Sequence, residues 1–403
     1  MGRHDAKPRA QGAPVEIAVA NVRAGTVLRI LHTESSVNWG GQEYRILDQM
    51  RWLADKGHAV ALAARPGSAL ALRALQYGLR VHDLAYLGHY NPMLIAAARR
   101  LVRRERFDIV DCHGSRDGAT HGFARDLSPV VRTRHLSTSL KPKLHRRLQW
   151  RWGCDRVIAT AQCIKDEIAA KDFADIQRID VIGEWAANEF FDIANKDAHR
   201  KSVREDYAVP AGSPLVCVVG MLRGDKAQEI LIRIAAELRR RGRPITALIV
   251  GADTDSAAGY EKFLRRTADE LGVAEDVRFT GYRDDAARLT QASDILVITS
   301  IAVEAQSRTA PQAFASRTPV IASAIGGVSE LVSPGRTGWL VSPGDVGAYA
   351  DAIEQALDDP AATARLVDTA RILAESELTI DRKMAATLNS YRAALLTSGR
   401  SAQ

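Results

Sequence analysis

Short apolar runs alternate along this chain with segments whose apolar residues recur at helical spacing. In the first half the runs are rich in strand-favouring residues and lie at 27–31, 59–63, 79–84, 108–112, 129–133, 156–159 and 179–182. The intervening segment 44–56 repeats apolar residues about one helical turn apart, as at Ile46, Met50 and Leu53. Short buried strands that alternate with helices predict a parallel, doubly wound α/β sheet.

The same rhythm fades between residues 188 and 214 and then starts again. The second series of apolar runs lies at 215–219, 245–250, 277–280, 295–298, 319–322 and 339–341. Helical spacing separates them at about 228–241, 259–271 and 309–316. We therefore expect two doubly wound, Rossmann-like halves that face each other across a cleft, with ligands at the carboxyl ends of the strands.

The predicted organisation has four parts. We expect a flexible tail over 1–25, an acceptor-binding domain over 26–195, a nucleotide-sugar-binding domain over 196–378, and a helical segment over 379–403 that packs back on the first domain. The tail is polar and basic and lacks the apolar stretch and cleavage site of a secretory signal. Since no run of about 18 apolar residues occurs, we expect no transmembrane helix.

The composition indicates a reducing compartment and a concentration of positive charge in the first half of the chain. The four cysteines form no CxxC pair, which argues against a zinc site or a disulfide framework and favours a cytoplasmic location. The net charge is +7, and no acidic residue interrupts the cations between Arg132 and Arg151. Tryptophans at 150 and 152 accompany this run, and a second arginine cluster spans 99–106. Such segments can contact an anionic membrane, although a solvated helix face explains each cluster alone; we expect no nucleic-acid partner.

Two glycine-containing turns follow predicted strands and precede helices. Gly40 and Gly41 follow the first strand, where paired glycines let a ligand approach the helix N-terminus. Arg223 and Lys226 follow Gly220 in the second half, where a guanidinium and an ammonium group could clamp a diphosphate. A tight turn and two solvated cations are the alternative interpretations. The missing G-x-G-x-x-G fingerprint argues against a nicotinamide dehydrogenase.

A third candidate segment, 300–323, places a carboxylate before a helix N-terminus. Glu304 follows a predicted strand, small and hydroxyl residues come next, and Gln312 stands eight positions later. This order suits recognition of hydroxyl and phosphate groups together. A Gly-Gly turn at 326–327 and a turn-strand-turn unit at 335–345 follow.

Taken together, these segments resemble the family 4, or group 1, glycosyltransferases of bacterial cell-surface polysaccharide and lipopolysaccharide synthesis. The resemblance runs from about residue 27 to residue 357 and is strongest in the second half. It implies the GT-B fold, a nucleotide-sugar donor, and retention of anomeric configuration with no metal and no required cofactor. It also implies a glycan or lipid-linked acceptor. If the acceptor is lipid-linked, we expect the basic clusters to face the inner surface of the cytoplasmic membrane.

The resemblance also implies roles for individual residues. Arg223 and Lys226 would hold the donor diphosphate, Glu304 would contact the donor sugar, and His113 would lie near the sugar and the acceptor. The remaining donor-binding positions are Gly40, Gly41, Ser307, Arg308, Thr309 and Gln312.

The chain departs from the family pattern at three places. Met221 stands where an arginine is usual, Gln312 replaces the glutamate that holds the ribose, and Glu184-Trp185 replaces a Pro-Asn-Gly turn. An amide still accepts one hydrogen bond and donates another, so ribose binding by Gln312 is still expected.

Leaving-group stabilisation is the main catalytic task that we expect, and no protein nucleophile is assigned. His113 could instead cap a strand end, and His135 is a second candidate near the acceptor. Asp253-Thr254-Asp255 reads as a D-x-D metal motif, but a solvated loop is the better interpretation. Two other functions remain open, a sugar-nucleotide epimerase of the same fold and a non-catalytic sugar-nucleotide binder.

Overall fold

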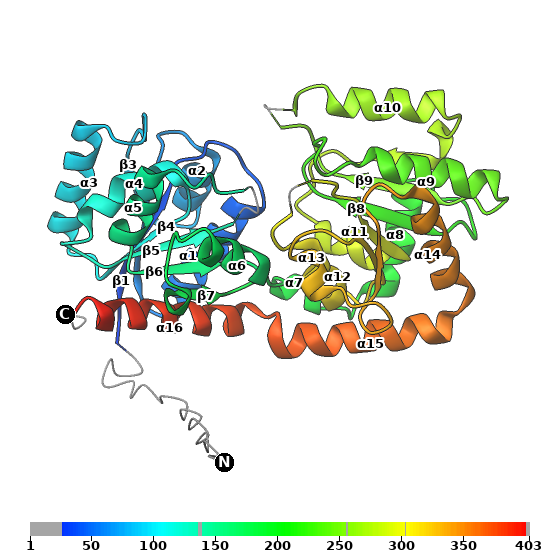
Figure 1. The fold of residues 1–403 in the computed structure, drawn as a ribbon. Coiled ribbons are helices and arrows are strands. Elements are labelled where there is room, and N and C mark those ends of the chain that lie inside the picture. The colour runs from blue at the N-terminus through cyan, green and yellow to red at the C-terminus, as the bar shows by residue number, and fades with distance from the viewer. Residues whose placement is uncertain (1–25, 136–138, 255–256, 303, 400–403) are drawn as a thin grey trace, which may run out of the picture.

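The computed structural model of the chain describes residues 26–135, 139–254, 257–302 and 304–399. The tail expected over 1–25 lies outside these residues, as do the last four residues of the C-terminal segment. The described chain forms two α/β lobes that stand side by side (Figure 1).

The first lobe is built on a sheet in which every described pairing is parallel, in the order β3-β2-β1-β4-β5-β6-β7. The strands are β1 (Arg29–Glu34), β2 (Ala59–Ala64), β3 (Arg80–Asp83), β4 (Ile109–Cys112), β5 (Val130–Arg134), β6 (Arg156–Ala159) and β7 (Ile179–Val181). The order reverses beside β1, which creates the switch point at which ligands bind in open α/β sheets.

Helices connect these strands and cover both faces of the sheet. They are α1 (Gly41–Asp55), α2 (Ala69–Gln76), α3 (Pro92–Glu105), α4 (Ser115–His121), α5 (Leu144–Gly153) and α6 (Gln162–Ala170), with short 3₁₀ turns η1 (Gly122–Ala124) and η2 (Ile176–Arg178). Local sequence explains their ends. Helix α3, for example, begins where the Asn91 side chain accepts the Met93 and Leu94 N–H groups, and it ends at left-handed Arg106.

The second lobe repeats the plan with a sheet in the order β10-β9-β8-β11-β12-β13. Its strands are β8 (Leu215–Val219), β9 (Thr246–Val250), β10 (Val277–Phe279), β11 (Ile295–Ile298), β12 (Val320–Ser323) and β13 (Trp339–Val341). Its helices and turns are α7 (Asn188–Phe191), α8 (Lys196–Asp206), α9 (Glu229–Arg240), α10 (Tyr260–Glu270), η4 (Ala274–Asp276), α11 (Ala286–Ala292), α12 (Thr309–Ala315), α13 (Val328–Leu331), α14 (Val346–Asp358) and α15 (Pro360–Glu377). The predicted pair of doubly wound sheets is thereby confirmed.

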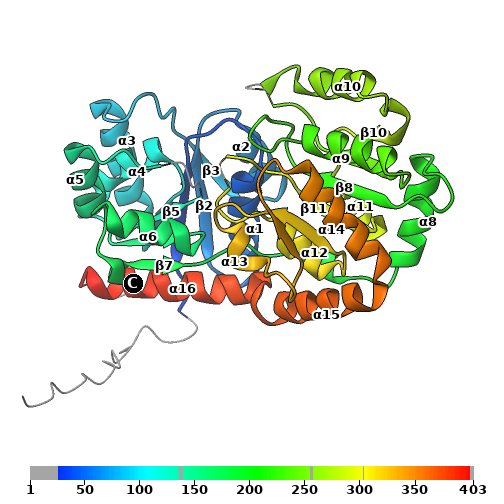
Figure 2. The ribbon, with the colours of Figure 1, turned by 45° about the vertical axis from the view of Figure 1, so that its right-hand side comes forward.

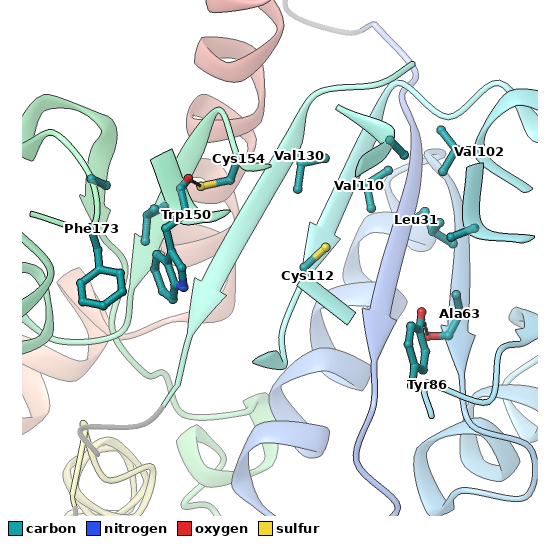
Figure 3. Packing of buried hydrophobic residues seen from close by; sticks show 14 of the residues in the cluster. Leu31, Ala63, Tyr86, Val102, Val110, Cys112, Val130, Trp150, Cys154 and Phe173 are labelled. Atoms are coloured by element: carbon teal, nitrogen blue, oxygen red, sulfur yellow. Dashed lines mark hydrogen bonds between the residues drawn. The ribbon is translucent and has the colours of Figure 1, made fainter. Parts of the chain in front are cut away.

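Buried side chains fill the space between the first sheet and its helices. Figure 3 shows part of this core, in which Trp150 of α5 packs edge-on against Phe173 with ring centroids 5.6 Å apart. Because both faces of the sheet are covered, its strands read as nearly continuous apolar runs. No helix among the described residues combines the length and the apolar character needed to cross a bilayer.

The chain crosses between the lobes twice, and the two crossings touch. After β7 it enters the second lobe through residues 182–187, and after α15 it returns to the first lobe at Thr379. Ala186 and Thr379 form an isolated parallel bridge, and the Ala186 N–H donates to the Leu378 carbonyl at 3.0 Å. The two connections therefore act as one double link.

The last helix, α16 (Ile380–Thr397), lies along the first lobe, whereas α15 lies along the second (Figures 1 and 2). Its Leu388, Tyr391 and Leu395 side chains are buried with Leu28 and Ile30 of the first sheet region. The first lobe thus depends on residues from the far end of the chain for part of its core.

This packing predicts a contrast between two neighbouring leucines of α16. Leu395 is 1% exposed and Leu396 is 43% exposed, so Leu395→Ala should lower the free energy of unfolding by about 2–5 kcal/mol. Leu396→Ala should change it by no more than about 0.5 kcal/mol. Urea unfolding of both variants measures the difference, and equal effects would contradict the packing of α16 on the first lobe.

Candidate active site

A cavity of about 850 Å³ lies between the lobes and is lined by both of them. The loops that line it follow β1, β4, β5, β8 and β11, so it sits at the carboxyl ends of both sheets, as expected for this architecture. Of the predicted site residues, His113, Arg223, Lys226, Glu304, Gly41, Ser307, Arg308 and Thr309 line it. Gly40 and Gln312 are not among the described lining residues.

Lys226 and Glu304 form the central ion pair of the second-lobe wall. Lys226 Nζ lies 2.5 Å from Glu304 Oε2, and the Ser300 hydroxyl donates to the same oxygen at 2.7 Å. Glu304 is 6% exposed. The pair presents an ammonium group and a fixed carboxylate side by side, which suits a phosphate and a sugar hydroxyl respectively.

Arg223 has an internal partner that the sequence interpretation did not anticipate. Its Nε and Nη2 atoms donate to the two oxygens of Asp225 at 2.8 and 2.6 Å. Its side chain is still 38% exposed and lines the cavity. A diphosphate would therefore share or displace this bidentate contact instead of meeting an unpaired guanidinium group.

Gly326 and Gly327 hold the loop that carries Glu304. A Cβ atom at Gly326 would lie 1.8 Å from the Glu304 carbonyl oxygen, and one at Gly327 would lie 2.0 Å from that of Ala305. Gly326 also has φ of 51°. Only glycine permits this approach without a shift of the neighbouring backbone. The glycine pair thus fixes the position of the Glu304 carboxylate.

Met221 and Gly40 contact each other across the cleft. A Cβ atom at Gly40 would lie 2.6 Å from the Met221 Cε atom. The residue that replaces the usual arginine is therefore packed against the first-lobe glycine turn. In that turn the Gly40 N–H donates to the Glu43 carboxylate at 3.0 Å, which orders the start of α1.

Arg308 also differs from its expected role. Its Nη2 atom lies 2.7 Å from Asp48 of α1, and its Nε atom lies 3.9 Å from Glu184. It joins the two lobes as well as lining the cavity. The Ser307 and Thr309 hydroxyls are 2.7 Å apart at the start of α12, where they line the same wall.

Arg45 explains the replacement of the usual turn at Glu184 and Trp185. Its fully buried guanidinium group donates to the carbonyls of Ile182 and Gly183 and to Glu184 Oε1, at 2.8 to 2.9 Å. It also lies 4.5 Å from the centre of the Trp185 ring. The replaced residues thus form a binding site for an arginine of α1 where the chain leaves the first lobe.

Glu330 links the second lobe to the start of α6. Its two carboxylate oxygens accept the N–H groups of Gln162 and Cys163 at 2.8 and 2.9 Å. A carboxylate at a helix N-terminus is stabilised by the helix dipole. Tyr44 and Tyr282 meet through their hydroxyls elsewhere across the lobes, so side chains tie the cleft together at several points.

Both ring nitrogens of His113 are occupied by other histidines. Nε2 lies 2.9 Å from Nδ1 of His32, and Nδ1 lies 2.9 Å from Nε2 of His135. Burial lowers the pKa of His113 to about 3, and the charge of Arg45 contributes to that shift. In this arrangement His113 has no ring nitrogen left for a substrate hydroxyl, whereas His135 also lines the cavity.

The first-lobe wall is cationic between residues 89 and 173. Arg132, Arg134, Arg146 and the histidines His89, His113, His135 and His145 line this part of the cavity, and no acidic residue of this segment does. Arg132 is 3% exposed, its guanidinium group lies 4.2 Å from the centre of the Trp150 ring, and its Nη1 atom is buried with no hydrogen-bond partner in the described chain. A buried, unsatisfied guanidinium nitrogen beside a cavity indicates a site for an anion.

The basic run 132–151 does not by itself distinguish Arg132, which is buried, from the exposed cations of the same run. The position of Arg132 inside the apolar run 129–133 could have revealed that it is buried and functional. Arginines are seldom found in buried strands unless they bind a partner. The basic run is in fact divided. It begins on buried β5, and its last member, Arg151, pairs with Asp172 at 2.8 Å.

Two groups contain residue types that can bind a metal ion. Asp253 caps α10 by accepting the Gly259 and Glu261 N–H groups at 2.7 and 2.8 Å, while Asp255 lies outside the described residues. His32, Asp111 and His113 bring ligand atoms within 4.8 Å of one another. The nearly parallel rings of the two histidines share a 2.9 Å contact, which is the spacing of a hydrogen bond.

Two family models match the chain, one in each lobe. The model described as Glycosyltransferase Family 4 matches residues 39–184, and the model described as Glycosyl transferases group 1 matches residues 199–372. The matched stretches contain the cavity loops of both lobes.

Curated relatives are similar over a large part of the chain. D-inositol 3-phosphate glycosyltransferase of Mycolicibacterium smegmatis is 30% identical over 277 residues, which cover 64% of this chain and 62% of the relative. The protein of the same name from Gordonia bronchialis is 31% identical over 310 residues, covering 72% and 66%. The chain thus matches slightly less than two thirds of the length of these relatives.

Solved structures share the arrangement of both lobes. A glycosyltransferase from Rickettsia africae superposes with a TM-score of 0.82 and 20% identity, covering 92% of this chain and 99% of that one. Anabaena HepE in complex with UDP and glucose superposes with a TM-score of 0.78 and 22% identity, covering 90% and 99%. The two lobes therefore have the GT-B fold.

Proposed function

We propose that the chain is a glycosyltransferase, as the family models that match its two lobes suggest, and that it transfers a sugar from a nucleoside-diphosphate donor to a phosphate-bearing acceptor. The observation that supports this most strongly is a single cavity with two kinds of wall. One wall carries Lys226 and Glu304, and the other carries Arg132, whose buried Nη1 atom has no hydrogen-bond partner among the described residues.

The donor end of the reaction rests on Lys226, Arg223 and Glu304. As the bond between the sugar and the β-phosphate breaks, negative charge develops on the departing diphosphate, and the two cations would stabilise it. Glu304 would accept hydrogen bonds from donor-sugar hydroxyls. The HepE structures contain UDP or UDP-glucose, which makes uridine diphosphate sugars the first donors to test.

We propose that the transfer retains anomeric configuration. The acceptor oxygen would form its bond to the anomeric carbon on the same face from which the diphosphate leaves, and the acceptor proton would pass to a departing phosphate oxygen. This route needs no protein nucleophile and no metal. Donor epimerisation or donor binding without transfer are the competing functions, and product analysis distinguishes all three.

The acceptor proposal follows from Arg132 and from the relatives. The relatives are named for an inositol phosphate acceptor, which favours a small phosphorylated polyol over the polysaccharide or lipopolysaccharide that the family resemblance suggested. Arg132 and Arg134 would bind the acceptor phosphate at the carboxyl end of β5.

A lipid-linked acceptor is the second candidate, and an exposed surface of the first lobe favours it. Figures 1 and 2 place α3, α4 and α5 together on the side of the first lobe that faces away from the second. The outer patch, as we call it, comprises the exposed apolar residues Met93, Phe123, Leu144 and Trp152 and the exposed cations Arg100, Arg103, Lys141 and Lys143. Apolar side chains interleaved with cations suit the surface of an anionic membrane.

Lys226→Ala should lower turnover by roughly 100-fold or more, because it removes a group that stabilises developing charge. Arg223→Ala should act in the same direction. The measurement is transfer from a panel of radiolabelled nucleotide sugars, with Lys262→Ala on the exposed face of α10 as the matched control. Activity within a fewfold of the parent protein for both site variants would contradict the assignment of Arg223 and Lys226 to diphosphate binding.

Arg132→Met should raise the KM for a phosphorylated acceptor about 10- to 100-fold, since a hydrogen bond to a charged group contributes about 1.5–3 kcal/mol. Methionine keeps an apolar chain against Trp150. Hydrolysis of the donor in the absence of acceptor should be unchanged, as should all activity of the exposed control Arg103→Met. An equal loss with an unphosphorylated acceptor would contradict the phosphate assignment.

Sedimentation with vesicles tests the outer patch. Binding should increase with the fraction of anionic lipid, by about 1 kcal/mol for each basic residue near the surface, and fall as salt rises. Changing Arg100, Lys141 and Lys143 to Ala should weaken it, whereas changing Lys262, Arg265 and Arg266 on α10 should not. Equal and negligible binding to neutral and anionic vesicles would contradict membrane contact and indicate that the outer patch is an ordinary solvated surface.

A further inference from the structure

Three histidines form a hydrogen-bonded row beside the cavity, and we call it the imidazole row. His32 of β1, His113 after β4 and His135 after β5 are linked by two contacts of 2.9 Å. Burial is the main cause that lowers the pKa of each ring, to about 3 for His32 and His113. The rings are therefore neutral near pH 7, and each carries one proton.

In a row of neutral imidazoles, all the hydrogen bonds must run from donor to acceptor in the same direction. Each ring donates from one nitrogen and accepts at the other, so the tautomer of one ring determines the tautomers of its neighbours. Two arrangements are possible. In one, all three rings carry the proton on Nε2, and in the other, all three carry it on Nδ1.

Asp111 is the acidic side chain that bears on this choice. Burial raises the pKa of its carboxyl group, and its hydrogen bonds with Tyr391 and Thr133 lower it. Its Oδ2 atom lies 3.7 Å from His113 Nε2, at the contact between His113 and His32. Its two oxygens accept from the hydroxyls of Thr133 at 2.8 Å and Tyr391 at 2.6 Å. A carboxylate that accepts on both oxygens favours a proton on the facing His113 nitrogen.

With the proton on His113 Nε2, the free lone pair of the row is at His135. His113 then donates to His32, and His135 donates from Nε2 to His113. Nδ1 of His135 is left as an acceptor, and it is buried with no hydrogen-bond partner among the described residues. His135 lines the cavity on the same wall as Arg132.

We propose that Asp111, held by Tyr391 of α16, sets the tautomers of the imidazole row so that His135 Nδ1 accepts a hydrogen bond from the attacking acceptor hydroxyl. This inference rests on the proposed transferase function. His135 is the residue that touches substrate, while Asp111, Tyr391, His32 and His113 are positioning residues. The low pKa of His135 makes it a poor base, so it orients the hydroxyl and leaves the proton for the departing phosphate.

Asp111→Asn is the variant that separates this role from a structural one. Asparagine keeps the shape of the side chain but presents N–H donors in place of one oxygen. Facing His113 Nε2, the amide would favour a lone pair there and reverse the row. His135 Nδ1 would then carry a proton and could no longer accept from the acceptor hydroxyl. The same substitution places a catalytic histidine of serine proteases in the wrong tautomer.

Long-range ¹⁵N–¹H NMR of ring-labelled histidine reports the tautomers directly. We expect His32, His113 and His135 to carry the proton on Nε2 in the parent protein and on Nδ1 in Asp111→Asn, with turnover reduced about 10- to 100-fold. Asp155→Asn, at another buried carboxylate of the same sheet, should leave the row unchanged. Nδ1 protons in the parent protein, or unchanged tautomers in Asp111→Asn, would overturn the inference.

Tyr391→Phe provides a second variant that retains the carboxyl group of Asp111. Loss of one of its two hydroxyl donors should weaken the preference, so that Nδ1-protonated His113 appears beside the Nε2 form. Tautomers identical to those of the parent protein would contradict a role of Tyr391 in setting the tautomers of the imidazole row. Because the NMR measurement requires no turnover, failure of the imidazole row and failure of the transferase proposal give separate results.

Discussion

The buried guanidinium group of Arg45 is the charge on which the junction of the two lobes depends. It satisfies two carbonyls of the segment that leaves the first lobe, and it pairs with Glu184 and the Trp185 ring. An arginine buried without such partners would cost several kcal/mol. The unusual sequence of this segment is therefore matched to α1, and that match positions the first-lobe wall of the cavity relative to the second.

The cations around the cavity differ in whether the protein already neutralises them. Lys226, Arg223 and Arg308 each lie against a carboxylate, from Glu304, Asp225 and Asp48 respectively. Arg132 has no such partner among the described residues. In the proposed reaction a donor phosphate would compete with internal carboxylates, while an acceptor anion would satisfy the buried Nη1 atom of Arg132. The two ends of the cleft are prepared for their ligands in different ways.

The parallel strands and the two-lobe architecture could be predicted because the central strands are buried on both faces and appear as nearly continuous apolar runs. The loops that line the cavity could be predicted for the same reason, since they follow those runs. The partners of the charged residues could not. Arg308 meets Asp48 across 260 residues, and Tyr391 meets Asp111 across 280. Such pairs follow from how the lobes and α16 come together, and no local pattern in the sequence encodes that arrangement.

The two neighbouring connections at Ala186 and Thr379 also define how the lobes can move. Since both covalent links lie side by side, the lobes can rotate about a single axis through them, whereas sliding apart would strain both links at once. The contacts of Glu330 with α6 and of Tyr44 with Tyr282 lie away from this axis. Because these contacts are far from the axis, a small change in their strength should change the width of the cleft considerably. We therefore expect the width of the cleft to depend more on these few hydrogen bonds than on the cores of the lobes.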